Sequence, residues 1–228
     1  MIPGMAQGVN EAMENIMEVK KPEKLIGLTG PYCAGKNHVA LLLERRGLAV
    51  LDVDKLGHRV IETEKERLAA RFGEGIVGAG GLVDRRRLGA AVFGNPQALS
   101  ALEDIIHPVV NREILAWLGE RAETEAACVI NAALLHRCSP AFEALDAVIL
   151  VKACLPVRLL RAKKRDRLPW TALVKRFGSQ RHFASQYSAV KADIYKVENS
   201  GFSGFTGRLV SGRLENRINE ILSRMGIT

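Results

Sequence analysis

The segment KLIGLTGPYCAGK, residues 24–36, joins a short apolar run to a glycine-rich turn. Lys24–Thr29 has the composition of a buried parallel strand and stops at a glycine. The next seven residues match the pattern G-x-x-x-x-G-K, in which glycines let successive backbone N–H groups turn toward phosphate oxygens: Gly30, Pro31, Tyr32, Cys33, Ala34, Gly35 and Lys36. His38–Arg46 follows with apolar residues at helical spacing. This succession of strand, turn and helix predicts a P-loop that binds nucleotide phosphates.

The end of this turn predicts how charge and metal are handled. Lys36 is expected to neutralise the outer phosphates as a point charge. The next position usually carries Ser or Thr, whose hydroxyl binds Mg²⁺, but here it is Asn37, followed by His38. A side-chain amide oxygen is also a hard ligand, so Asn37 is the expected Mg²⁺ ligand, directly or through water. A degenerate loop that binds nucleotide without turnover stays open as an alternative.

Strands and helices alternate along the rest of the chain. Apolar runs predict four more strands at Leu48–Val53, Ala127–Asn131, Ala147–Val151 and Asp193–Val197. Helical patterns cover Glu64–Phe72, Arg86–Phe93, Pro96–Ile106, Pro108–Arg121 and Gly212–Met225, and Pro156 is placed to open another helix. The predicted fold class is α/β, a P-loop NTPase-type parallel five-stranded sheet with helices on both faces.

The predicted domain organisation is one domain with two additions. Residues 1–22 form an N-terminal extension without the features of a secretory signal. Within 23–228, the core comprises about 23–54, 126–157 and 186–228, a helical insertion covers about 55–125, and a lid covers about 158–185.

Composition and charge limit the class of protein. Hydrophobic residues make up 47% and charged residues 25%, as in a globular protein, and no apolar run reaches the roughly 18 residues of a membrane span. No two of the four cysteines have the C-x-x-C spacing, so we do not expect a zinc site. We expect a cytoplasmic location, where thiols stay reduced.

The segment from Arg158 to Arg181 carries nine basic residues and one acid, Asp166. The net charge of this segment, nine minus one, equals the net charge of +8 of the whole chain. Such a concentration predicts an anionic partner, either a polyphosphate or a nucleic acid, although a solvated helix face is the plain alternative. Only Trp170 and Phe177 interrupt it as aromatics, which disfavours a single-strand nucleic-acid binder.

Two carboxylates end the second predicted strand, Asp52 and Asp54. They alternate, so they are expected on opposite faces, and ligands bind beyond the carboxyl ends of such strands. One of them is a candidate base for a substrate hydroxyl, and a helix N-cap is the equally open alternative.

An ordered set of motifs resembles the dephospho-CoA kinase family over about residues 24–201. These are the strand and P-loop, Val50–His58, Leu82–Leu88 with Val92-Phe93, Ile105–Pro108, Arg161 with Arg165-Asp166, and Asn199–Gly201. The resemblance implies a nucleotide core, a CoA-binding helical insertion and a mobile lid. It implies phosphoryl transfer from ATP to the ribose 3′-hydroxyl of dephospho-CoA, with Mg²⁺ and without nucleic-acid or membrane partners. A monomer or weak homo-oligomer is expected.

The resemblance also implies residue roles. Asp54 matches the base, Lys36 the β/γ-phosphate cradle, and Arg165 the lid arginine, supported by Arg161. The loop residues 30–38 and Asn199 are expected to bind ATP. Expected substrate-binding residues are Asp54, His58, Arg85, His107 and Arg112.

The chain departs from the family pattern at four positions. The family usually has Ser or Thr at position 37, an acid at position 131 and Pro at position 133, and often Arg at position 58. This chain has Asn37, Asn131, Ala133 and His58. The changes at 37 and 131 fall where Mg²⁺ is expected, while Asp54 is retained. A P-loop kinase for another small acceptor, such as a nucleoside or nucleotide, and a nucleotide-binding pseudokinase therefore stay open.

Overall fold

The computed structural model describes residues 21–178, 183, 187, 191–201 and 207–227. The chain divides into two compact units. The first comprises Met1–Leu51 and Leu118–Thr228, and the second comprises Asp52–Trp117. Most of the predicted N-terminal extension lies outside the described residues.

The first unit is built on a five-stranded sheet with strand order β2-β3-β1-β4-β5. The strands are β1 Lys24–Thr29, β2 Ala49–Asp52, β3 Ala127–Asn131, β4 Ala147–Lys152 and β5 Asp193–Glu198. The pairings of β1 with β3, β1 with β4 and β4 with β5 are parallel, which confirms the predicted sheet. β1 is central, so the turn that follows it emerges at the middle of the carboxyl edge, where such sheets bind ligands.

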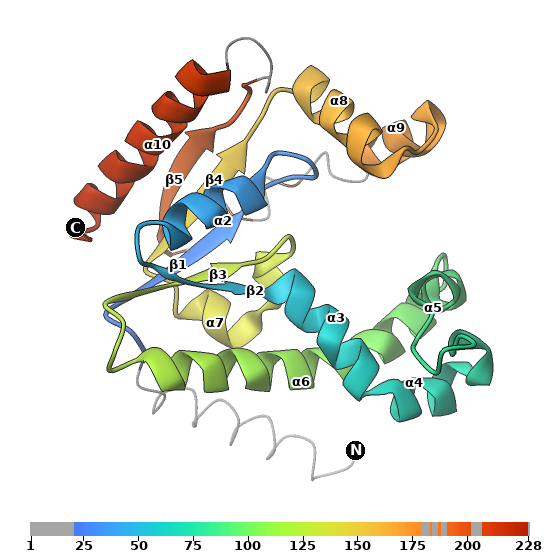
Figure 1. Ribbon diagram of the computed structural model, residues 1–228. Helices are drawn as coiled ribbons and strands as arrows, with labels where there is room; N and C mark the ends of the chain where they lie inside the picture. The colour runs from blue at the N-terminus through green and yellow to red at the C-terminus, as the bar shows by residue number, and fades with distance from the viewer. Residues whose placement is uncertain (1–20, 179–182, 184–186, 188–190, 202–206, 228) are drawn as a thin grey trace. The chain divides into compact units, whose positions relative to one another are not determined.

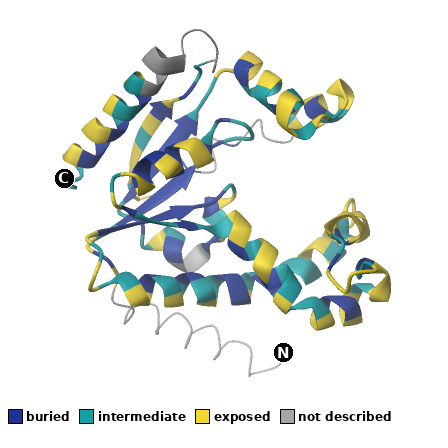
Figure 2. Cartoon of the chain, in the orientation of Figure 1, coloured by how far each residue is buried: buried dark blue, intermediate teal, exposed yellow. Residues whose placement is uncertain are grey.

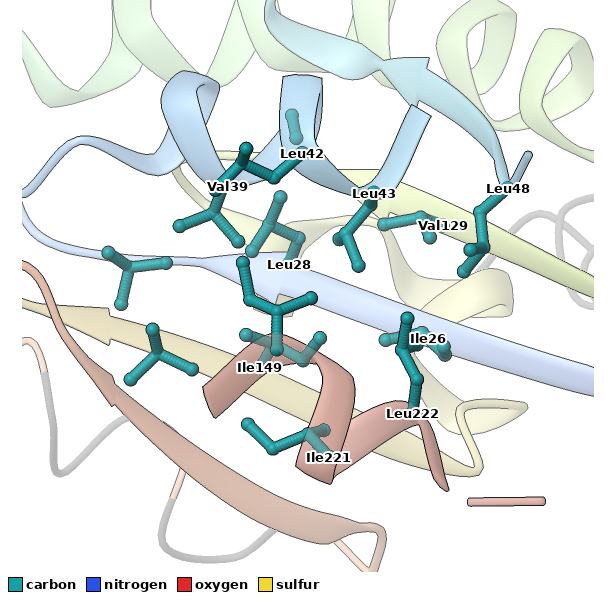
Figure 3. Packing of buried hydrophobic residues seen from close by; sticks show 14 of the residues in the cluster. Ile26, Leu28, Val39, Leu42, Leu43, Leu48, Val129, Ile149, Ile221 and Leu222 are labelled. Atoms are coloured by element: carbon teal, nitrogen blue, oxygen red, sulfur yellow. The ribbon is translucent and has the colours of Figure 1, made fainter. Parts of the chain in front are cut away.

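Helices α2 Lys36–Glu44 and α10 Gly207–Arg224 cover one face of this sheet. Figure 3 shows their apolar side chains, among them Leu42, Leu43 and Ile221, meeting Ile26 and Ile149 of the strands. The central strands are almost continuously buried, as Figure 2 shows, because a parallel sheet is covered on both faces.

The opposite face of the sheet is covered by the segment that contains η2 Leu135–Arg137 and α7 Ser139–Glu143. A Cβ on Gly27 of β1 would lie 2.5 Å from Leu135 Cδ2 and 2.9 Å from Leu145 Cδ1. A side chain at position 27 would have to displace these two leucine side chains, because this layer packs directly against the backbone of β1.

The described residues of the basic segment lie mainly on two helices, α8 Leu155–Asp166 and α9 Trp170–Gly178. Pro156 lies in the first turn of α8, as predicted. We call α8 and α9 the lid helices. None of the described helices is both long and apolar enough to cross a membrane.

The second unit contains α3 Val53–Thr63, α4 Lys65–Phe72, η1 Glu74–Ile76, α5 Arg85–Val92 and most of α6 Pro96–Arg121. Two helices were predicted for the α6 region, and that prediction is wrong, because one helix runs through Pro108. Pro108 cannot donate the backbone hydrogen bond to the preceding turn. The buried residues Ile106, Val109, Val110 and Ile114 continue one apolar stripe past it, and their packing stabilises the continuous helix.

Candidate active site

The predicted P-loop lies between β1 and α2. The N–H groups of His38 and Val39 donate to the Gly35 carbonyl at 3.0 and 3.3 Å, which starts α2 directly at the turn. Gly35 has a left-handed φ of 94°, and a Cβ there would lie 2.1 Å from Asn199 Nδ2. Backbone conformation and space both require glycine at this position.

Side chains from distant parts of the chain hold the carbonyl groups of this loop. Arg158 Nε donates to the Tyr32 carbonyl at 2.8 Å. Asn199 Nδ2 and Arg161 Nη1 donate to the Ala34 carbonyl at 3.0 and 3.2 Å. Because C=O and N–H point in opposite directions across a trans peptide, the N–H groups that follow these carbonyls, those of residues 33 and 35, point away from these side chains. That arrangement matches a backbone nest for an anion.

The end of β1 is supported by a buried tyrosine. Tyr187 is fully buried, and its hydroxyl lies 3.3 Å from Thr29 Oγ1 and 3.5 Å from His136 Nδ1. Burial raises the pKa of the Tyr187 phenol. Tyr187 therefore stays neutral and can hydrogen-bond to Thr29, the residue just before the loop. No local pattern in the sequence indicates this role.

The predicted lid arginines contact the loop or residues that hold it. Besides the Ala34 carbonyl, Arg161 donates to the Gly201 carbonyl at 2.8 Å. Arg165 pairs with Asp166 at 2.7 Å, and its guanidinium lies 5.0 Å from the Tyr32 ring centroid. The structure thus brings Arg161, Arg165 and Asn199 together with the loop.

The pKa of the loop cysteine, Cys33, depends on its burial and on the arginines around it. Cys33 is half-buried with a φ of 60°. Burial raises the pKa of its thiol, while the guanidinium groups of four arginines lower it: Arg165, Arg158, Arg161 and Arg176. The loop therefore lies in a concentrated positive field, as a polyphosphate site requires. Arg158 and Arg176 were counted in the basic segment, but the sequence did not identify them as neighbours of the loop.

Two amide side chains lie on elements that lead into or out of this edge of the sheet, Asn37 on α2 and Asn131 at the end of β3. Asn37 is exposed at the second position of α2. Asn131 ends β3 and is paired in register with Leu28 of β1, just before the loop. It is 1% exposed, and its Oδ1 accepts no hydrogen bond from any residue that the structure describes. Since buried polar atoms are normally hydrogen-bonded, this oxygen is a candidate cation or water ligand.

The second unit has a basic pocket of about 450 Å³, lined by Lys55, His58, Arg59, Glu62 and Arg85. The first four lie at helical spacing on α3, and Arg85 begins α5. Glu62 Oε2 accepts a hydrogen bond from the Val83 N–H at 3.0 Å, which ties the segment before α5 to α3. The pocket brings together His58 and Arg85, which were predicted to bind substrate. Lys55 and Arg59 also line it and were not predicted, although their spacing from His58 along one helix could have indicated them.

Asp52, the last residue of β2, and Asp54 have different local roles. The predicted strand through Val53 is wrong in its last residue, because α3 begins there and Asp52 is its N-cap, accepting from the Lys55 N–H at 3.1 Å. Asp54 is therefore an acid in the first helical turn and does not lie on a strand.

Two other residues predicted to bind substrate do not lie on α3 or α5. His107 and Arg112 are both on α6. Neither lines the basic pocket.

Comparisons with known proteins agree on one family. A family model described as dephospho-CoA kinase matches residues 24–202. The dephospho-CoA kinase of Treponema pallidum is 32% identical over 89% of this chain and 96% of its own length. That of Shouchella clausii is 33% identical over 86% of this chain and 99% of its own length.

Solved structures support the fold. A Thermus thermophilus protein has a TM-score of 0.73 at 30% identity and covers 90% of this chain and 98% of its own. The dephospho-CoA kinase of Campylobacter jejuni has a TM-score of 0.58 at 21% identity, over 88% of this chain and 96% of its own, and it supports the fold alone.

Proposed function

This chain belongs to the dephospho-CoA kinase family, and from that premise we propose that it transfers the γ-phosphate of ATP to the 3′-hydroxyl of dephospho-CoA, giving coenzyme A and ADP. The observation that carries the proposal is the extent of the family match, residues 24–202. It includes the P-loop, the second unit and the lid helices in one continuous span.

On the donor side, the P-loop binds the triphosphate of ATP. The backbone N–H groups of the loop and the α2 N-terminus contact phosphate oxygens, and Lys36 neutralises them. Arg161 and Arg165, whose contacts with the loop are described above, add positive charge. Asn199 borders this site through its bond to Ala34.

The two amide side chains fit Mg²⁺. Asn37 and Asn131 would hold it through their carboxamide oxygens, directly or through water, because hard oxygen ligands suit this ion. The unsatisfied, buried Oδ1 of Asn131 supports this assignment. When bound with ATP, Mg²⁺ supplies charge neutralisation on the phosphates.

On the acceptor side, the basic pocket of the second unit binds the phosphate groups of dephospho-CoA. Four side chains that are cationic or can become so line it, against one carboxylate. Arg85 suits phosphate through its planar fork, and His58 and Lys55 add charge. His107 and Arg112 are proposed to contact other parts of the same substrate.

The chemical step needs an acceptor for one proton. The 3′-hydroxyl oxygen forms the new bond to the γ-phosphorus, the bond between this phosphorus and the bridging oxygen breaks, and ADP leaves. Asp54 accepts the hydroxyl proton as the general base. The lid helices beside the loop exclude water, so that the phosphoryl group goes to the substrate hydroxyl.

The first experiment is a coupled assay of ADP release with ATP, Mg²⁺ and dephospho-CoA, with coenzyme A identified as product. Adenosine and a nucleoside monophosphate serve as alternative acceptors. We expect turnover with dephospho-CoA as the acceptor and none with either alternative acceptor. Turnover only with another acceptor would reassign the substrate, and ATP binding without any turnover would indicate a pseudokinase.

Variants separate the two sides of the reaction. Asp54→Asn is expected to lower kcat by about 10²- to 10⁴-fold with little change in ATP affinity, as for loss of a general base. Arg85→Ala is expected to raise KM for dephospho-CoA and leave KM for ATP unchanged. Arg86→Ala is its matched control, because Arg86 is exposed and adjacent but does not line the pocket. Equal effects of both arginine variants would contradict the assignment of the pocket.

A further inference from the structure

Tyr32, the third residue of the P-loop, contacts both lid helices. Its ring meets the Phe177 ring of α9 edge-on, with centroids 5.3 Å apart and planes at 70°. The guanidinium groups of Arg165 and Arg176 lie 5.0 and 4.9 Å from its ring centroid. Its carbonyl accepts from Arg158 Nε of α8. Figure 1 shows the loop between β1 and α2 directed toward these two helices.

The phenol hydroxyl joins the same arrangement. It donates to Asp166 Oδ2, and Arg176 Nη1 donates to it at 3.1 Å. Asp166 also accepts from Arg165 at 2.7 Å and lies 3.5 Å from Arg176 Nη1. Tyr32 and Asp166 together therefore hold one arginine from each lid helix at the loop.

The cluster places two guanidinium groups on one carboxylate and one aromatic ring. Two guanidinium groups share one carboxylate, and an aromatic face attracts cations through its quadrupole without neutralising them. The cluster therefore keeps both guanidinium groups beside the phosphate loop. A triphosphate would gain from both arginines without first having to collect them from solvent, which is the benefit of preorganisation.

We propose that Tyr32 is a positioning residue that docks the lid helices on the P-loop and holds Arg165 and Arg176 beside the triphosphate site before ATP binds. The inference deepens the donor side of the proposed function and rests on it. The hydroxyl provides the link to Asp166 and Arg176, and the ring provides the contacts with Phe177 and the guanidinium planes.

Two substitutions separate the hydroxyl from the ring. Tyr32→Phe keeps the ring contacts, and Tyr32→Leu removes both kinds. We expect Tyr32→Leu to raise the Kd for ATP, by calorimetry, and KM for ATP by about tenfold, the factor for 1.4 kcal/mol, with a smaller rise for Tyr32→Phe. KM for dephospho-CoA should stay unchanged. Without nucleotide, trypsin should cleave α8 and α9 of Tyr32→Leu several times faster than those of the wild type.

Trp170→Leu is the matched control. Trp170 is an exposed aromatic residue of α9, and its ring lies 5.4 Å from Lys163 Nζ of α8, a contact within the lid helices. This variant should leave the Kd for ATP unchanged. A change equal to that of Tyr32→Leu would show a general effect of aromatic loss and would overturn the proposal.

A double-mutant cycle keeps the test decisive if Tyr32→Leu fails to fold. Tyr32→Phe and Arg176→Met remove opposite ends of one contact, so their effects on the Kd for ATP should be clearly less than additive. Additive effects, or an unchanged Kd in both single variants, would overturn the role of Tyr32. Calorimetry and proteolysis need no turnover, so a wild type that binds ATP but makes no coenzyme A would contradict the proposed function while the Tyr32 result still stands.

Discussion

At position 35 the backbone requires glycine for two separate reasons. A φ of 94° is unfavourable for any other residue, and Asn199 occupies the space of a Cβ. Gly47 has a similar φ of 83°, but no atom lies within 4 Å of the place that a Cβ would take there. The two positions therefore distinguish conformational strain from a steric clash.

Gly35→Ala is expected to weaken ATP binding by about tenfold or more, because the displaced Asn199 no longer holds the Ala34 carbonyl. Gly47→Ala should cost only about 1–2 kcal/mol of stability and leave the Kd for ATP unchanged. Calorimetry with ATP and chemical denaturation of both variants measure the difference. Equal losses of ATP affinity would contradict the steric explanation.

The cysteines differ in their expected reactivity. Hydrogen bonding from the backbone of Val157 and from Ser200 lowers the pKa of the exposed Cys154 thiol. Burial raises the pKa of Cys33, and that of Cys128 to about 11. At about pH 7.5 the thiolate fraction is therefore larger at Cys154 than at Cys33 or Cys128, and the thiolate is the reactive form.

Timed alkylation with iodoacetamide should label Cys154 first, Cys33 more slowly and Cys128 last, as read by peptide mass spectrometry. ATP should slow the labelling of Cys33 and leave that of Cys154 unchanged. Labelling of Cys33 ahead of Cys154 would show that the lid arginines outweigh its burial.

At the scale of elements, α10 shows how far periodicity reaches. The predicted amphipathic helix Gly212–Met225 agrees with the observed Gly207–Arg224 except at its ends. Its buried residues Leu214, Ile218, Ile221 and Leu222 lie on the stripe that packs on the sheet. The opposite face carries Glu220, paired with Arg217 and Arg224.

Ile218→Ala is expected to destabilise the protein by about 2–5 kcal/mol, because it removes fully buried methyl groups and leaves a cavity. Glu220→Ala, on the exposed face, should leave the denaturation midpoint nearly unchanged, since exposed ion pairs contribute little. Urea denaturation followed by circular dichroism compares the two. Similar losses would indicate that α10 is not held by its apolar stripe.

At the scale of the whole molecule, the excess charge coincides with the nucleotide site. The segment whose charge equals the net +8 covers α9 and most of α8, and four of its arginines lie around the P-loop. The contacts of these arginines with the loop favour the polyphosphate interpretation of the charge over a nucleic-acid surface.

ATP is therefore expected to stabilise the folded protein through its phosphates. At 100 times its Kd, ATP should add about 2.7 kcal/mol of stability. Adenosine at the same concentration should add far less, and Lys36→Ala should abolish most of the ATP effect. Thermal denaturation with each ligand tests this, and an equal effect of adenosine would place the main contacts on the base.

The sequence predicted local structure better than contacts. The five strands, the P-loop and the amphipathic helices follow from composition and period, which report on neighbours along the chain. The break at Pro108 was predicted wrongly, because the tertiary packing of the α6 stripe outweighs one missing backbone hydrogen bond. The strand assignment of Val53 failed because a capping carboxylate, Asp52, starts the helix earlier.

By itself, the sequence determined the α/β class, the phosphate loop and the order of motifs that resembles one kinase family. Tertiary structure alone placed Asn199 on the Ala34 carbonyl across 165 positions and Arg158 on the Tyr32 carbonyl across 126. It also left Asn131 Oδ1 without a hydrogen bond among the described residues. The physical reason is that periodicity and turn chemistry are local, whereas these contacts depend on which strands become neighbours and on how the helices pack against them.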